Sequence, residues 1–271
     1  MPSHGLRFDV NCSILFTELP VLARPAAAKA AGFDAVEFWW PFPQAVPADA
    51  EVDAFVAALA DAGVELVGLN FFAGDMPAGD RGLVSWPGRE QEFRDNVALV
   101  AAIGERTGCR TFNALYGNRI GGDGGADAAA QDDLAAEQLA FAADAVARMG
   151  GTVVVESISG PQPYPLRTAA DAFAVIDRAD RDNIAFLADL YHLSVNGDDL
   201  SKVIGEYAAR VGHVQIADAP GRHEPGTGEL DLDAHLAALE HAGYGGWVGL
   251  EYTPSGPSAD SFAWLSKENT T

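Results

Sequence analysis

Short apolar runs alternate with amphipathic segments along nearly the whole chain. The runs are rich in β-branched and aromatic residues, which is typical of strands in a sheet that is covered on both faces. Eight such strands are predicted, at residues 6–14, 35–42, 64–72, 110–117, 152–159, 183–192, 212–218 and 247–252. Helices are predicted between and after them, at residues 22–32, 52–63, 89–108, 133–150, 168–179, 199–211, 232–243 and 258–265. Several helices end at glycine, as helix C-terminal caps prefer.

Eight strand–helix units in about 250 residues predict an α/β fold, a closed parallel (β/α)₈ TIM barrel. A doubly wound open sheet is the alternative, but it has fewer units, and no Gly-x-Gly-x-x-Gly turn follows the first strand. The glycine-rich loop at 117–127 lacks the Lys-Ser/Thr ending of a phosphate-binding loop. Since no domain boundary is visible, we expect one domain over residues 1–271, with a frayed tail at 266–271.

Composition narrows the range of partners. The hydrophobic content of 48% over 271 residues supports a real core, and a formal net charge of −22 argues against nucleic acid and anionic membrane surfaces. Cys12 and Cys109 lie in apolar surroundings and are expected to be reduced, buried thiols. Neither a signal peptide nor an apolar run of about 18 residues is visible, so we expect a cytoplasmic protein.

Polar side chains end four successive predicted strands: Glu156, Asp189, Gln215 and Glu251. A single carboxylate at such a position is commonly a cap or an ion-pair partner. In a TIM barrel, however, the active site lies at the carboxyl ends of the strands, so these four side chains are expected to converge. Three carboxylates would repel one another in a buried site, and a divalent cation would relieve that repulsion. The all-oxygen set favours Mg²⁺ or Mn²⁺ over zinc.

Further polar residues flank this group. Asn70 ends the third predicted strand, and His192 follows Asp189 by three residues, so both are candidates for binding a substrate. His192 has two alternative roles: a buried histidine whose hydrogen bonds are all made within the protein, or a residue that supports a metal ligand. His213 lies deeper in its strand, two residues before Gln215, and is expected to support the ligand group from behind.

Six stretches carry a resemblance to a known family: NCSILF, GFDAVEF, AGDMPAGDRGLVSWPGREQEFRD, DLYH, GHVQIADAPGRHEPGTGELD and GYGGWVGLEY. From about Leu6 to Leu265 the chain resembles the hydroxypyruvate isomerase family of the xylose-isomerase-like TIM barrels. The resemblance implies an isomerase that interconverts hydroxypyruvate and 2-hydroxy-3-oxopropanoate (tartronate semialdehyde).

The resemblance also implies roles for individual residues. The family's two proton-transferring glutamates fall on Glu156 and Glu251, and its metal positions fall on these two residues together with Asp189 and Gln215. Related ketose 3-epimerases carry His at the position of Gln215. A substrate carboxylate would need a cation, for which Arg222 in the loop after the seventh strand is the first candidate, with Arg89 and Arg119 as others.

Other functions stay open at the level of the sequence. Ser157, Ser159 and Leu69 stand where a family member has Pro, Asn and His, which leaves the substrate unsettled between a three-carbon acid, a 2-oxo-tetronate and a ketose for 3-epimerisation. A catalytically dead barrel that binds a small molecule would have lost metal-facing residues, yet all four are present. A barrel-type abasic-site endonuclease would need many His ligands and a basic face. A homo-oligomer is compatible with the sequence.

Overall fold

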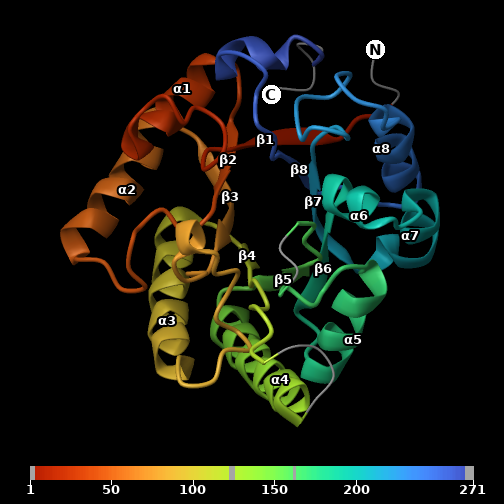
Figure 1. Ribbon diagram of the computed structural model, residues 1–271. Helices are drawn as coiled ribbons and strands as arrows, with labels where there is room; N and C mark the ends of the chain where they lie inside the picture. The colour runs from red at the N-terminus through yellow and green to blue at the C-terminus, as the bar shows by residue number, and fades with distance from the viewer. Residues whose placement is uncertain (1–3, 122–125, 161–162, 266–271) are drawn as a thin grey trace.

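Eight parallel strands form a closed barrel in which each strand pairs with the next along the chain and β8 pairs with β1 (Figure 1). The structure is a computed structural model that describes residues 4–121, 126–160 and 163–265. The strands are β1 Arg7–Asn11, β2 Ala35–Phe38, β3 Glu65–Asn70, β4 Thr111–Asn113, β5 Thr152–Glu156, β6 Ile184–Asp189, β7 Val211–Ile216 and β8 Trp247–Leu250. The predicted (β/α)₈ fold is therefore confirmed.

Helices surround the barrel and cover the outer faces of its strands (Figure 1). The α-helices are α1 Arg24–Ala30, α2 Asp49–Ala62, α3 Glu90–Thr107, α4 Ala126–Ala147, α5 Ala169–Ala179, α6 Leu190–Asn196, α7 Leu200–Tyr207 and α8 Leu232–His241. Short 3-10 helices lie at η1 Val21–Ala23, η2 Met76–Ala78, η3 Ala208–Arg210 and η4 Ser258–Phe262. None of the helices within the described ranges combines the length and the apolarity that a membrane span requires.

The predicted strands run too far at their carboxyl ends. The strand predicted at 183–192 ends at Asp189, because the carboxylate of this residue accepts a hydrogen bond from the backbone N–H of His192 and caps α6. The strand predicted at 110–117 ends at Asn113, although the next apolar residues stay buried in the loop. An apolar run in the sequence indicates that its residues are buried. Burial continues past the last hydrogen bond between strands, so the run is longer than the strand. The tail at 266–271 lies outside the described residues, so its fraying stays a prediction.

The barrel interior is polar in the layer just below the strand ends. Asp9, Glu37 and His213 point into it and are almost fully buried. Two glycines make room for Glu37: a Cβ atom on Gly249 would lie 2.5 Å from Oε1 of Glu37, and one on Gly68 would lie 3.1 Å from its Cβ. This layer supports the residues above it.

Candidate active site

The carboxyl ends of four neighbouring strands bring together the four predicted side chains. Glu156, Asp189, Gln215 and Glu251 are 7%, 1%, 2% and 4% exposed, and Asp189 and Gln215 are directly paired across β6 and β7. Beside them lies a cavity of about 490 Å³. Its lining comprises Trp39, Asn70, Met76, Pro77, Arg81, Leu115, Glu156, Ile158, Ser159, His192, Arg222 and Glu251. The cavity thus includes both predicted catalytic glutamates and the three residues predicted to bind substrate.

The amide group of Gln215 has a defined orientation. Its Nε2 donates a hydrogen bond to Oε1 of Glu37 at 2.7 Å, which leaves Oε1 of Gln215 buried and without a hydrogen-bond partner in the described part of the chain. The Oδ2 atom of Asp189 is likewise buried and lacks such a partner. Buried polar atoms are normally satisfied, so two lone oxygens beside buried carboxylates fit a cation that accepts their lone pairs.

The charges of the site also favour a cation. Burial, together with the charges of Glu251 and Asp189, raises the pKa of Glu156 well above its ordinary value. Burial raises the pKa of Glu251 to about 7, and it raises the pKa of Asp189 as well. One oxygen each of Asp189 and Glu251 and one ring nitrogen of His192 lie within 4.8 Å of one another. A hard divalent ion would neutralise this group, and carboxylate and amide oxygens are its preferred ligands.

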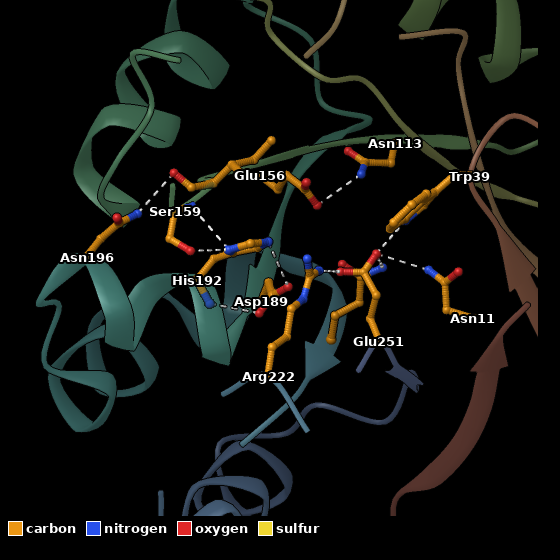
Figure 2. Close-up of polar contacts among 12 residues, drawn as sticks. Asn11, Trp39, Asn113, Glu156, Ser159, Asp189, His192, Asn196, Arg222 and Glu251 are labelled. Atoms are coloured by element: carbon orange, nitrogen blue, oxygen red, sulfur yellow. Dashed lines mark hydrogen bonds and ion pairs between the residues drawn. The ribbon is translucent and has the colours of Figure 1, made fainter. Parts of the chain in front are cut away.

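The two oxygens of Glu251 have separate partners (Figure 2). Oε1 accepts hydrogen bonds from Nδ2 of Asn11 at 3.0 Å and from Nε1 of Trp39 at 2.5 Å. Oε2 accepts one from Nη2 of Arg222 at 2.5 Å. Arg222 also lies over the ring of Tyr191. The carboxylate plane of Glu251 is therefore fixed from both sides. Within the described ranges, Glu156 has one side-chain donor, Asn113, at 3.0 Å.

His192 faces the site as a neutral hydrogen-bond donor. The backbone N–H of Ser159 donates to its Nδ1 at 3.1 Å, so Nδ1 carries the lone pair and the proton of the neutral ring is assigned to Nε2. Burial lowers the pKa of His192 to about 3, which keeps the ring uncharged near neutral pH. Its Nε2 atom lies 3.6 Å from Oδ2 of Asp189 (Figure 2).

Glu37 connects the layer below the site to the residues at the strand ends. Its Oε2 lies 2.6 Å from Nε2 of His213, and its Oε1 accepts from Asn11 at 2.9 Å as well as from Gln215. His213 thus supports Gln215 through Glu37 rather than by direct contact. Burial lowers the pKa of His213, but the carboxylates of Glu37, Asp9 and Glu251 together outweigh burial, so the pKa is raised. In the sequence, Glu37 stands out as the polar residue of the second predicted strand, but the pattern alone does not indicate which residues it contacts.

The arginines differ from expectation. Arg222 lines the cavity, but Arg89 and Arg119 are used elsewhere: Arg89 pairs with Glu92 and Asp80, and Arg119 pairs with Asp132. Neither of these two arginines lines this cavity. The cavity instead contains Arg81, in the long loop after β3, which is not among the arginines predicted from the sequence. In the sequence, Arg81 lies in a loop that follows a strand end and in the stretch AGDMPAGDRGLVSWPGREQEFRD, but neither feature distinguishes it from Arg89.

Comparison with known proteins shows the family of this chain. The family model described as Xylose isomerase-like TIM barrel matches residues 25–268. A protein from Streptomyces coelicolor named "Putative hydroxypyruvate isomerase" is 54% identical, over 96% of this chain and 95% of its own. The hydroxypyruvate isomerase of Escherichia coli is 33% identical, over 96% and 98%. The 2-oxo-tetronate isomerase of Cupriavidus necator is 35% identical, over 96% and 97%.

Solved structures share the fold. A protein from Brucella melitensis named AP endonuclease, family 2, superimposes with a TM-score of 0.87 at 37% identity and covers 97% of this chain and 98% of its own. An L-ribulose 3-epimerase superimposes with a TM-score of 0.70 at 21% identity, which shows the fold alone. The family model matches most of the chain, and the relatives align with it over nearly its whole length. This chain belongs to the hydroxypyruvate isomerase family of the xylose isomerase-like TIM barrels, a family of isomerases.

Proposed function

We propose that this protein interconverts hydroxypyruvate and 2-hydroxy-3-oxopropanoate by proton transfer between neighbouring carbons. The observation that carries the proposal is the pair of buried glutamates, Glu156 and Glu251, on one cavity beside the lone oxygens of Asp189 and Gln215. Carboxylates serve as acids and bases near neutral pH when burial raises their pKa values, as it does here. The names of the relatives support a three-carbon oxo acid as the substrate.

Glu156, Asp189, Gln215 and Glu251 would hold the cofactor, Mg²⁺ or Mn²⁺, since all four offer oxygen. When bound, such an ion polarises the carbonyl and hydroxyl oxygens of the substrate and so acidifies its C3 hydrogen. The amide of Gln215 keeps the ligand set one charge less negative than a fourth carboxylate would. This difference matters in a site where the carboxylates already repel one another.

The protein side chains carry the proton transfer. One glutamate removes a proton from C3 of hydroxypyruvate, and the electron pair of that C–H bond forms the C2–C3 double bond of an enediolate. A proton is then returned at C2, from the same glutamate or from the other, while the hydroxyl proton passes from O3 to O2. His192, neutral and protonated at Nε2, donates a hydrogen bond to a substrate oxygen. Asn70, which lines the same cavity, forms a second hydrogen bond to the substrate.

The second candidate is a 2-oxo-tetronate isomerase. The same proton transfer then takes place on an acid that is one carbon longer, and the relative from Cupriavidus necator favours it. Ketose 3-epimerisation has only the shared fold in its favour. The name of the Brucella melitensis structure suggests DNA as a substrate. Against that, the chain carries a net charge of −22, and the four strand-end candidates offer oxygen rather than the His ligands of a zinc cluster.

A comparison of rates tests the proposal. Protein treated with EDTA should be inactive on hydroxypyruvate and should regain activity with Mg²⁺ or Mn²⁺. Glu251→Gln and Glu156→Gln should each lower turnover by roughly 10²- to 10⁴-fold with the fold intact. Glu65→Gln changes an exposed carboxylate on β3 and is the matched control. Higher kcat/KM on a 2-oxo-tetronate than on hydroxypyruvate would favour the second candidate, and full activity of metal-stripped protein would remove the cation from the proposal.

A further inference from the structure

We propose that Arg81 binds the carboxylate group of the substrate and makes the cavity selective for acids over neutral compounds of the same length. The inference rests on the proposed function, because it concerns an oxo acid in the cavity beside Glu156 and Glu251. Two arginines line this cavity within the described part of the chain, Arg81 and Arg222, and they differ in how much of their charge is already neutralised.

Arg222 is occupied by the carboxylates of the site. Its Nη2 donates to Oε2 of Glu251 at 2.5 Å, and Glu251, Asp189 and Glu156 all act on its charge. One guanidinium that faces three buried carboxylates leaves no surplus positive charge for an anionic ligand. To bind a substrate carboxylate through Nη2, Arg222 would first have to release Glu251.

Arg81 keeps its charge available. Its Nη1 donates to the backbone oxygens of Met76 at 2.9 Å and Asp80 at 2.6 Å. In the described residues, its Nε and Nη2 atoms have no hydrogen-bond partner, and no carboxylate pairs with it. The nearby carboxylate of Asp80 is used elsewhere: its Oδ2 accepts from the backbone N–H of Asp75 and lies 3.4 Å from Nη1 of Arg89.

The pattern of bonds on Arg81 suits a carboxylate. A guanidinium group can present the N–H groups of Nε and Nη2 side by side, and this edge matches the two oxygens of a carboxylate. Because Nη1 is tied to carbonyl oxygens of its own loop, the edge that remains free is this one. The group is thereby oriented before a ligand arrives, which reduces the entropy lost on binding.

The loop that carries Arg81 is packed onto the barrel. Gly82 has φ of 113°, and a Cβ atom there would lie 1.9 Å from the carbonyl oxygen of Leu115, beyond the end of β4. Only glycine allows so close an approach. The N–H of Gly82 also donates to the oxygen of Ala73, and Asp75 caps the short helix η2. These contacts hold Arg81 at the cavity wall beside Met76 and Pro77.

Steady-state kinetics of three variants test the inference. Arg81→Met should raise KM for hydroxypyruvate roughly tenfold to hundredfold and change kcat less, because the carboxylate is bonded to C2 but no bond within it is made or broken in the reaction. Arg81→Lys keeps the charge without the paired N–H edge and should give an intermediate KM. Arg89→Met removes a cation of the same loop that is ion-paired outside this cavity, and it should leave KM near that of the wild type.

A neutral substrate tests whether the effect of Arg81 depends on the charge of the carboxylate. With dihydroxyacetone, which has a CH₂OH group in place of the carboxylate, Arg81→Met should leave kcat/KM nearly unchanged, so the preference for the acid should shrink by the same tenfold to hundredfold. An unchanged KM for hydroxypyruvate in Arg81→Met, with wild-type thermal stability, would overturn the role of Arg81. Failure of the proposed function is distinguishable, since the wild type itself would then not turn over hydroxypyruvate.

Discussion

Nε2 of Gln215 lies 2.7 Å from Oε1 of Glu37, in the buried layer below the strand ends. The carboxylate of Glu37 can only accept in this contact, so it selects the amide orientation that leaves the oxygen of Gln215 without a partner and available to the proposed cation. A cation attracts a neutral amide oxygen less strongly than it attracts a carboxylate. Its orientation therefore has to come from the protein, and Glu37 supplies it.

Glu37→Gln should weaken metal binding. The new amide can present its own N–H₂ group to Gln215, which would then turn its oxygen toward position 37 and its nitrogen toward the site. Loss of a residue that orients a ligand typically lowers metal affinity by about 10- to 100-fold. Mn²⁺ titration followed by electron paramagnetic resonance measures this affinity without any turnover.

The control for this variant is again Glu65→Gln, which removes one carboxylate from the surface. It should bind Mn²⁺ like the wild type. Equal Mn²⁺ affinity in Glu37→Gln and the wild type, with both proteins folded, would show that Glu37 does not determine the orientation of Gln215.

Solvent deuterium should enter the product at C2 during turnover. A proton held on a glutamate can exchange with water before it is returned, whereas a hydride that moves directly from C3 to C2 cannot. Proton magnetic resonance of 2-hydroxy-3-oxopropanoate formed in D₂O measures the incorporation. Complete retention of the C3 hydrogen at C2 would rule out the enediolate path and with it the roles given to Glu156 and Glu251.

His192 should contribute no ionisation to the pH profile between about pH 5 and 8. Its pKa is lowered by burial to about 3, so it stays neutral throughout this range. His192→Gln should lower kcat/KM by roughly tenfold at every pH, as expected for a lost hydrogen bond, with the shape of the profile unchanged. His241→Gln, on the exposed end of α8, is the control. A limb of the wild-type profile that vanishes in His192→Gln would contradict a neutral donor.

Asp9→Asn should stabilise the protein near pH 8. Both carboxylate oxygens of Asp9 are buried without a partner among the described residues, and burial, with the charge of Glu37, raises its pKa well above the ordinary value. A folded-state pKa above the unfolded one means that this group's contribution to stability falls as pH rises from about 4. Asn does not ionise, so the stability that Asp9→Asn gains over the wild type should grow as the pH rises.

Calorimetric melting at several pH values measures this gain. An increase of several degrees in Tm near pH 8 and a smaller one near pH 4.5 are expected. Asp182→Asn, at an exposed position, should leave Tm unchanged at both. A gain in Tm that is the same at all pH values would mean that ionisation of Asp9 does not limit stability.

The sequence predicted those features that repeat along the chain. Strand–helix alternation predicts the barrel, and a polar residue at the end of an apolar run predicts that Glu156, Asp189, Gln215 and Glu251 meet, because parallel strands share one carboxyl end. The role of Glu37 was not predictable in this way. Its partners His213 and Gln215 lie more than 170 residues away along the chain, and only the closed barrel brings them together.

Which arginine lines the cavity was not predictable, for a different reason. Nothing in the sequence ranks Arg81 above Arg89 or Arg119, since all three lie in polar segments. Which arginine faces the cavity depends on ion pairs with residues such as Glu92 and Asp132, and on the tight turn at Gly82. Local sequence does not encode such a choice among similar side chains.

The two glycines beside Glu37 have a consequence for the evolution of this family. Glu37 starts on β2, reaches β7 through the barrel interior, and fills space that side chains at Gly68 and Gly249 would otherwise take. A different side chain at position 215, such as His, would meet the same carboxylate in the same space. Positions 37, 68, 215 and 249 are therefore expected to change together among relatives, as one inherited unit.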